Sequence, residues 1–170
     1  MKVIANTTVI SNFASVGRLD LLQALLGEVF ISSGVHDEIQ DGLQEGYDFY
    51  SDLESLVYPF TEEGWLRLTS LEGEDELKLY GSLPRQLHRG EASCLAIARH
   101  RGWVLLTDDK KARKVARQWG ITLSGTLGVL VQAVQAGLLT VDEGNGLLRE
   151  MIAKGYRSPY ADLRLLLVNE

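Results

Sequence analysis

The sequence predicts an α/β fold in which a central parallel sheet is covered by helices on both faces. The candidate strands are short, continuous apolar runs, at residues 2–5, 28–32, 103–107 and 121–124. Segments with apolar residues at three- and four-residue spacing, which is typical of helices, alternate with these runs. Strands that are apolar throughout indicate a parallel sheet, because both faces of such a sheet are buried.

The remaining elements follow from the same patterns. Helices are expected at residues 9–27, 35–43, 73–81, 90–101, 110–120 and 126–139, with a further strand at 65–69. The acidic stretch 44–63 is expected to begin as a helix and to break near Pro59. Thr140 and Glu143 form the capping-box pattern of another helix. Ser158 followed by Pro159 predicts the start of the last helix.

The length of the chain favours one domain. Its 170 residues match the size of an ordinary domain, and no repeat, low-complexity segment or linker divides them. We expect a single domain over residues 1–170, with a core at 2–139 and a C-terminal helical tail at 140–170.

The composition is that of an average globular protein, with 45% hydrophobic and 24% charged residues. Cys94 is the single cysteine, so it forms no internal disulfide, and its apolar helical surroundings predict a buried core residue. The N-terminal apolar stretch is too short for a signal peptide. No run reaches the roughly 18 apolar residues of a membrane span. We therefore expect a cytoplasmic protein without membrane association.

Charge is distributed unevenly along the chain. The net charge of −6 taken alone argues against nucleic acid as a partner. Residues 41–80, however, hold eleven acids against two Lys or Arg, whereas residues 85–117 hold nine Lys or Arg against three acids. A chain that is acidic overall can therefore present a basic face. The alternative is that these charges belong to ordinary solvated helix surfaces.

Polar side chains follow the predicted strands at their carboxyl ends, where ligands bind in parallel α/β sheets. They are Asn6 with Thr7 and Thr8, Asp37 with Glu38, Asp108 with Asp109, and Ser124 with Thr126; Glu91 opens the helix before the third of these corners. Carboxylates that converge cannot all stay ionised without a compensating cation. Mg²⁺ or Mn²⁺ takes oxygen ligands and can polarise a phosphate and activate a bound water. The pattern therefore indicates phosphodiester hydrolysis.

Each of these residues has an ordinary structural alternative. Asp109 at a helix start is a normal N-cap, and Asp108 beside it favours the helix dipole. Glu91 in a first helical turn is equally ordinary, Glu38 fits a surface acid, and Asn6 fits a helix cap. Lys110 and Lys111 oppose the dipole at their helix start. Their place beside the acidic corner suits contacts to a phosphate backbone.

Four segments of the chain carry a resemblance to a known family: VIANTTVISNFASVGRLDLL, EVFISSGVHDEI, HRGEASCLAIARHRGWVLLTDDKKARKVARQWGI and SGTLGVLVQAVQAGLL. They resemble the PIN-domain superfamily, and its uncharacterised VapC-like branch most of all. The resemblance covers residues 2–139. It implies a three-layer α/β/α, Rossmann-like PIN fold with a parallel sheet. It also implies a Mg²⁺- or Mn²⁺-dependent ribonuclease, often the toxin of a toxin–antitoxin pair and often a homodimer.

By position, the resemblance places the acids of the family on Asn6, Glu38, Glu91 and the Asp108–Asp109 corner, where the family's threonine-any-aspartate pattern selects Asp109. Asn6 departs from the family, which has aspartate there, and a neutral amide is a weaker ligand for a hard cation. The first hypothesis is an endoribonuclease in which Glu38, Glu91, Asp108 and Asp109, with Asn6, hold the metal and activate water. RNA contacts are assigned to Lys110, Lys111, Arg113, Thr8, Ser124 and Thr126.

Two other hypotheses compete with the first. One is the same fold, degenerate at Asn6, that binds RNA or a protein partner such as an antitoxin without cleavage. The other is a receiver domain or a haloacid-dehalogenase-type phosphatase. Both of these place their acids at the first strand, where this chain has Asn6-Thr7-Thr8, so the sequence disfavours them.

Overall fold

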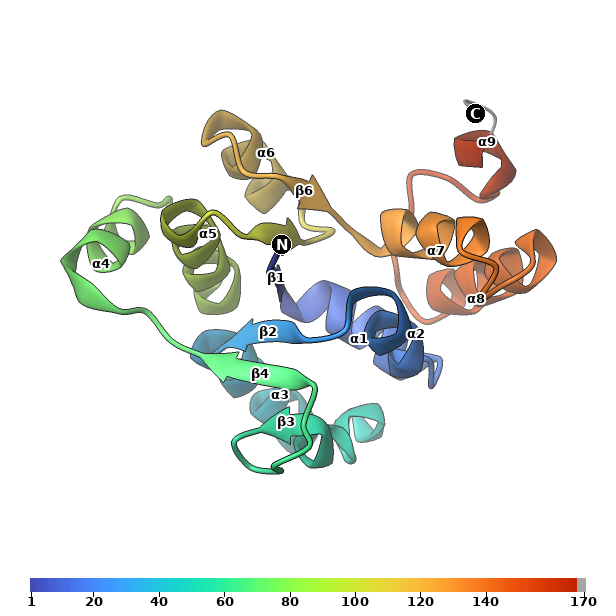
Figure 1. The fold of residues 1–170 in the computed structure, drawn as a ribbon, viewed down its shortest axis with the longest axis horizontal. Helices are drawn as coiled ribbons and strands as arrows, with labels where there is room; N and C mark the ends of the chain where they lie inside the picture. Colours follow the sequence, from blue (N-terminus) through green and yellow to red (C-terminus); the bar gives the residue numbers. More distant parts are fainter. Residues whose placement is uncertain (168–170) are drawn as a thin grey trace.

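A parallel sheet lies at the centre of the computed structural model, which describes residues 1–167. In this part of the chain six strands pair in the order β3-β4-β2-β1-β5-β6, and every pairing is parallel (Figure 1). The strands are β1 (Val3–Ala5), β2 (Val29–Ser32), β3 (Val57–Tyr58), β4 (Leu66–Thr69), β5 (Val104–Leu106) and β6 (Leu123–Ser124). The predicted α/β fold with a parallel sheet is confirmed.

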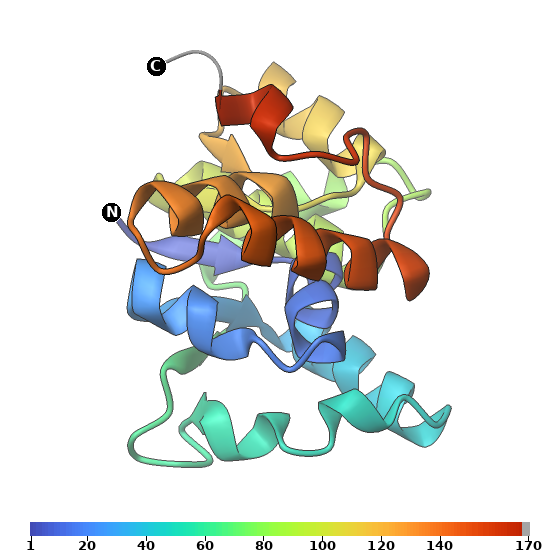
Figure 2. The same ribbon diagram turned by 90° about the vertical axis from the view of Figure 1, so that its right-hand side faces the viewer.

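Helices flank the sheet. They are α1 (Thr7–Ser15), α2 (Leu19–Leu26), α3 (Ser33–Gln44), α4 (Gly73–Gly81), α5 (Arg89–Arg101), α6 (Lys110–Gln118), α7 (Thr126–Gln135), α8 (Val141–Ala153) and α9 (Arg164–Leu167), with the 3₁₀ turns η1 (Asp48–Tyr50) and η2 (Leu53–Leu56). One group packs around α5, which contacts α3, α4 and α6. A second group joins α1, α2, α7 and α8, and the blue and orange helices of Figure 2 show it.

The register of the two central strands creates the edge where polar side chains meet. Ala5 pairs with Leu106, so the residues that follow, Asn6 and Thr107, leave the sheet side by side. The Asn6 N–H donates to the Leu106 carbonyl at 2.8 Å, which extends the ladder by one residue. Asn6 and Thr107 are both buried, so the core continues up to the point where the polar groups begin.

The buried interior matches the apolar pattern of the sequence. Ile4 and Leu105 from the two central strands are enclosed with Phe13 of α1 and Leu95 of α5. Cys94 is fully buried beside them, as predicted, and burial raises the pKa of its thiol to about 12. No helix within residues 1–167 has both the length and the apolar character needed to cross a bilayer.

Three predicted helices are wrong in extent or place. The helix expected at 9–27 is two helices, because Gly17 takes a left-handed conformation (φ +67°) that ends the first. The acidic stretch 44–63 forms η1, η2 and β3, because Tyr50 and Leu53 turn inward and β3 pairs with β4. The last helix begins at Arg164, and Ser158-Pro159 lies in an irregular segment.

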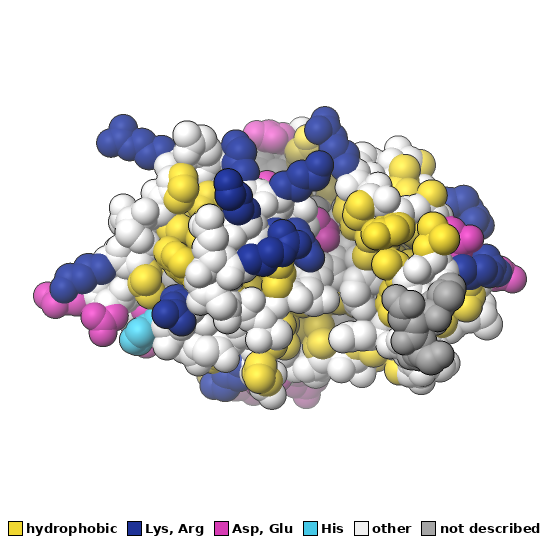
Figure 3. All heavy atoms as spheres, turned by 90° about the horizontal axis from the view of Figure 1, so that it is seen from above, with side chains coloured by type: hydrophobic (Ala, Val, Ile, Leu, Met, Phe, Trp, Pro, Cys, Tyr) yellow, Lys and Arg dark blue, Asp and Glu magenta, His cyan; other side chains and the backbone are white. Residues whose placement is uncertain are grey.

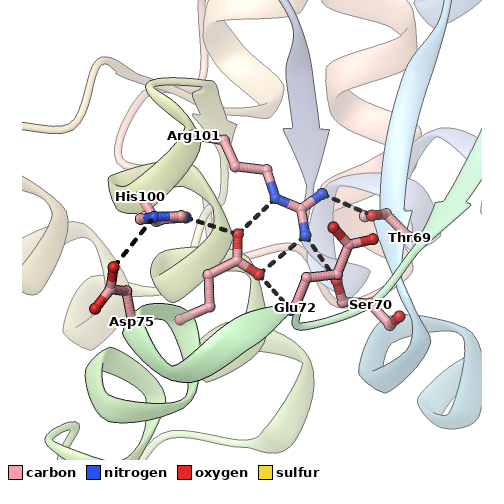
Figure 4. A network of polar contacts seen from close by, with 7 residues as sticks. Thr69, Ser70, Glu72, Asp75, His100 and Arg101 are labelled. Carbon is pink, nitrogen blue, oxygen red and sulfur yellow. Dashed lines mark hydrogen bonds and ion pairs between the residues drawn. The ribbon is translucent and has the colours of Figure 1, made fainter.

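A buried acid on α4 is held in an ion-pair network that the sequence patterns do not reveal. The Glu76 side chain is 1% exposed. Its carboxylate accepts hydrogen bonds from Arg101 Nε at 2.6 Å and Arg101 Nη2 at 2.9 Å (Figure 4). His100 Nδ1 and the Glu72 N–H also contact this carboxylate. The Arg101 guanidinium is the main reason that the pKa of Glu76 is lowered to about 2.

Candidate functional site

The candidate site begins where β1 and β5 end. Asn6 Nδ2 donates to Thr107 Oγ1 at 2.8 Å, and the Asp109 N–H donates to the same hydroxyl at 3.2 Å. Asn6 precedes α1 but its side chain makes no capping hydrogen bond to that helix. Its amide oxygen accepts no hydrogen bond from the described residues. The side chain therefore joins two strand ends and keeps an oxygen available.

Glu38 on α3 is positioned by the first turns of two other helices. Its Oε2 accepts from Thr7 Oγ1 at 2.5 Å and its Oε1 accepts from the Gly90 N–H at 2.8 Å. A side-chain carbon at residue 90 would stand only 2.7 Å from the Glu38 oxygens. Glycine at position 90 therefore permits the carboxylate of Glu38 to approach the start of α5.

Glu91, the next residue, is 7% exposed. One of its oxygens, Oε2, accepts from the His88 N–H at 3.1 Å, which is the reach-back bond of a capping box. The ordinary capping role is therefore present, and it occupies one oxygen of the two. Glu91 makes no ion pair with Lys or Arg among the described residues.

The acids around Glu91 repel it. Burial is the main reason that the pKa of the Glu91 carboxyl is raised, and the charges of Asp109 and Glu38 raise it further. Asp109 caps α6, because its Oδ1 accepts from the Ala112 N–H at 2.8 Å. We call the side chains of Asn6, Glu38, Glu91 and Asp109 the acidic edge. A buried acid whose pKa is raised, as that of Glu91 is, is typical of functional sites.

Asp108 has a different role from Asp109. Its Oδ1 accepts from the Thr126 N–H at 2.8 Å, and its Oδ2 accepts from Thr126 Oγ1 at 2.5 Å and from Asn12 Nδ2 at 3.0 Å. Both oxygens are therefore used to tie the β5 corner to α7 and α1. Burial raises the pKa of this carboxyl as well. Asp108 therefore forms a structural bridge, and a share in the metal site with Asp109 stays a prediction.

Thr126 also differs from expectation. We expected an RNA contact there, but the side chain is fully buried and its hydroxyl donates to Asp108. Thr8 is half-buried, and its hydroxyl accepts from the Asp108 N–H at 3.3 Å. The Ser124 carbonyl accepts from Arg113 Nη1 at 3.3 Å. Thr8 lines a cavity that reaches Asp109, and Ser124 lines another cavity beside Asp108, whereas Thr126 holds the framework.

The donor chemistry of the acidic edge fits a hard divalent cation. Carboxylate and amide oxygens are the groups that Mg²⁺ and Mn²⁺ take from proteins. Within residues 1–167, however, no three His, Cys, Asp or Glu side chains are already gathered closely enough to hold a metal ion. The residues present therefore suit the ion in type without forming a complete coordination shell.

Basic side chains of α6 lie beside the acidic edge. Lys110 and Lys111 are exposed and form no ion pair within the described chain. Arg113 is half-buried and donates to the carbonyl of Thr107 at 2.8 Å. Figure 3 shows Lys and Arg side chains gathered on the face that carries α6. The basic face predicted from the sequence is therefore present on the surface that carries α6.

Sequence reasoning gave no specific role to several residues that build this site. Thr7 and Asn12 donate hydrogen bonds to Glu38 and Asp108, and Thr107 accepts one from Asn6. One signal for Asn12 exists in the sequence. Thr8 and Asn12 lie four residues apart in α1, so they share one face of that helix. For Thr107, the pairing of β1 with β5 is needed, and no local pattern gives it.

Comparison with known proteins settles the family. The family model DUF3368, described as a PIN domain, matches residues 2–168. The chain belongs to the PIN-domain family. The match extends past residue 139, where the sequence resemblance ended. No curated protein matches the chain.

Solved structures agree on the fold. A PilT N-terminus domain protein from the hyperthermophilic archaeon Sulfolobus solfataricus matches with a TM-score of 0.53 and 12% identity, covering 79% of this chain and 94% of that chain. At this identity the likeness shows the fold alone. The parallel sheet and flanking helices of this PIN domain are therefore shared with that protein, whereas the roles of its acidic edge rest on its own residues.

Proposed function

We propose that this PIN domain is a Mg²⁺- or Mn²⁺-dependent endoribonuclease of the VapC-like toxin type. The observation that carries the proposal is Glu91, a nearly buried acid that is repelled by Asp109 and Glu38 and has no Lys or Arg partner in the described chain. Such an arrangement is unfavourable for the protein alone and becomes favourable when a cation binds. These acids lie at the carboxyl ends of parallel strands, beside the basic helix α6. This position suits a phosphodiester substrate.

The residues of the chain have separate roles in this proposal. Glu91 and Asp109 would hold the ion, with the amide oxygen of Asn6 and the carboxylate of Glu38 beside them. The bound ion would supply Lewis-acid activation of a phosphate and an acidified water. Thr107 orients Asn6 through its hydroxyl, and Thr7 orients Glu38. Lys110, Lys111 and Arg113 hold the RNA backbone through its phosphates.

A second function is favoured by one observation. Asn6 lacks the negative charge of an aspartate, and its Nδ2 group is engaged by Thr107 at 2.8 Å. A site with one charge fewer binds a hard cation more weakly. The alternative is therefore a degenerate PIN domain that binds RNA, or an antitoxin-like protein partner, without cleaving RNA. The proposal of a ribonuclease also includes assembly as a homodimer and a cytoplasmic location.

Cleavage assays separate the two functions. A panel of single-stranded RNAs is incubated in Mg²⁺ or Mn²⁺ with wild type, Asp109→Asn, Asn6→Asp and the control Asp52→Asn, whose side chain is exposed and distant in sequence from the acidic edge. We expect wild type and the control to cut equally. Asp109→Asn should cut at least about a hundredfold more slowly, because an amide replaces a charged ligand. Asn6→Asp should cut faster.

Two results would decide against the nuclease. Cleavage by neither wild type nor Asn6→Asp would exclude the enzymatic function. Cleavage by Asn6→Asp alone would show that the natural chain is the degenerate, binding form.

A further inference from the structure

A cavity of about 740 Å³ lies beside Asp108, the sequence neighbour of Asp109. One wall is α6 and the turn between β6 and α7, and the other wall is the irregular segment Tyr156–Pro159. In Figure 2 this segment, drawn in red after the orange α8, rises beside α8 to the level of α6. The cavity therefore sits between the basic helix and the C-terminal segment.

Cationic side chains outnumber acidic ones in the lining of this cavity. Lys110, Arg117 and Arg157 reach it, are exposed, and make no ion pair with any described residue. Arg113 also lines it and donates only to backbone carbonyls. Asp108 is the one acid among the lining residues, and both of its oxygens already accept hydrogen bonds. The cavity thus carries uncompensated positive charge.

The same cavity has apolar surface. Leu123, Leu127, Tyr156 and Pro159 contribute to its lining. An anion such as free phosphate uses the cations alone, whereas a nucleotide also presents a flat base that packs on aromatic and apolar side chains. Cations beside an apolar wall therefore favour a phosphate that carries a base.

A second cavity of about 520 Å³ shares lining residues with the first and reaches the acidic edge at Asp109. Asp108, Lys110, Tyr156 and Arg157 line both cavities, and the second also reaches Thr8 and Asp109. A single strand whose phosphate lies at Asp109 can therefore continue past Lys110 into the larger cavity. An acidic peptide would share the cations but would have no reason to follow this path to Asp109.

We infer that the larger cavity binds one nucleotide of a single-stranded RNA, its phosphate held by Arg117 and Arg157 and its base packed against Tyr156. The inference rests on the proposed function, because it names the path of the same RNA beyond the cleavage site. Arginine suits the role, since its planar guanidinium binds phosphate through two parallel hydrogen bonds.

Binding is measured in EDTA, so that metal and cleavage play no part. The probes are adenosine 3′,5′-bisphosphate by calorimetry and a fluorescein-labelled single-stranded RNA octamer by anisotropy. The variants are Arg117→Gln and Arg157→Gln, and the control is Arg85→Gln, which removes an exposed arginine away from both cavities. Thermal unfolding midpoints verify that all four proteins are folded.

Each cavity variant is expected to weaken the octamer and the bisphosphate at least about fivefold. Each should also reduce the slope of log affinity against log salt by about 0.7, the value for one phosphate contact on a single strand. The control should leave both quantities at the wild-type values. Wild-type affinity in both cavity variants would overturn the inference. Competition by a hexaglutamate peptide as strong as that by the bisphosphate would also overturn it, in favour of an acidic protein partner.

The outcome of this binding experiment does not depend on the outcome of the cleavage assay. If the Arg variants lose binding and no RNA is cleaved, the nucleotide site stands and the nuclease does not. If RNA is cleaved while the variants keep wild-type binding and KM, the nuclease stands and the nucleotide site is refuted.

Discussion

Two nearly buried glutamates in this PIN domain have opposite surroundings. Glu76 is enclosed by Arg101 and His100, and its pKa is lowered to about 2 (Figure 4). Glu91 has Asp109 and Glu38 as its charged neighbours, together with His88, and its pKa is raised by burial and by the two acids. The first acid is compensated within the chain, whereas the second is compensated only in part.

This difference indicates that Glu76 serves the stability of the fold, whereas Glu91 serves function. A buried acid with a complete set of donors strengthens the fold, because its charged form is preferred in the folded state. A buried acid that is repelled by its neighbours weakens the fold unless a ligand relieves it, and such sites are retained for function. Glu76 therefore joins α4 to α5, and the acidic edge is where a cation is expected.

The largest expected effect on stability is at the compensated acid. Glu76→Gln should lower the free energy of unfolding by about 3 kcal/mol at pH 7, since a pKa near 2 against an ordinary 4.5 is worth about 1.4 kcal/mol for each pH unit. Urea unfolding measures the change. The control Glu74→Gln removes an exposed acid in the same helix and should change stability by less than about 0.5 kcal/mol.

The pH dependence of that difference has a fixed sign. The folded pKa of Glu76 is lowered, so its contribution is complete above the unfolded pKa and is lost as the pH falls from about 4.5 towards 2. The gap between wild type and Glu76→Gln should therefore narrow over that range. A gap that stays constant from pH 7 to pH 3 would show that packing, and not charge, makes Glu76 important.

A smaller effect should distinguish the two adjacent aspartates. Asp108→Asn places an amide group where Thr126 and Asn12 both donate, so at least one donor loses its acceptor. We expect a loss of about 2 kcal/mol in unfolding free energy. Asp109→Asn should leave stability within about 0.5 kcal/mol, because asparagine caps a helix as well as aspartate does. Equal losses in the two variants would contradict the division of roles.

The smallest expected change is a gain in stability. Glu91→Gln removes a repelled charge while keeping the capping bond to His88. In EDTA at pH 7.5 it should raise the unfolding free energy by roughly 0.5 to 2 kcal/mol, the range of single stabilising substitutions. Because the folded pKa of Glu91 is raised, the gain should vanish as the pH falls to the ordinary pKa of a carboxyl. Destabilisation at pH 7.5 would mean that Glu91 is only a cap.

Sequence patterns predicted the parallel fold because the strands are apolar throughout and lie between amphipathic helices. They also predicted that Glu38, Glu91 and Asp109 would lie near one another, since the carboxyl ends of neighbouring strands share an edge. The residue types in TDDKK did not separate the roles of Asp108 and Asp109, although the family resemblance selected Asp109. Side-chain direction at a strand-to-helix corner depends on partners from distant segments, here Thr126 and Asn12.

Other features were beyond local patterns for the same reason. Glu76 sits in an acidic stretch that suggests a solvated surface, and only the packing of α4 against α5 brings Arg101 to it. The cavity beside α6 needs Tyr156–Pro159, a segment that the Ser-Pro pattern assigned to a helix start. Capping rules describe local preference, and here the segment is irregular and lines the cavity beside α6.

The most direct test of the acidic edge measures how Mn²⁺ changes the unfolding free energy at pH 7.5 in wild type, Glu91→Gln and Glu76→Gln. An ion that binds only the folded state stabilises it by about 2.7 kcal/mol at a hundred times its Kd. Wild type and Glu76→Gln should gain equally as Mn²⁺ rises, and Glu91→Gln should gain little. Equal gains in all three proteins, or no gain in wild type, would contradict a cation site at Glu91.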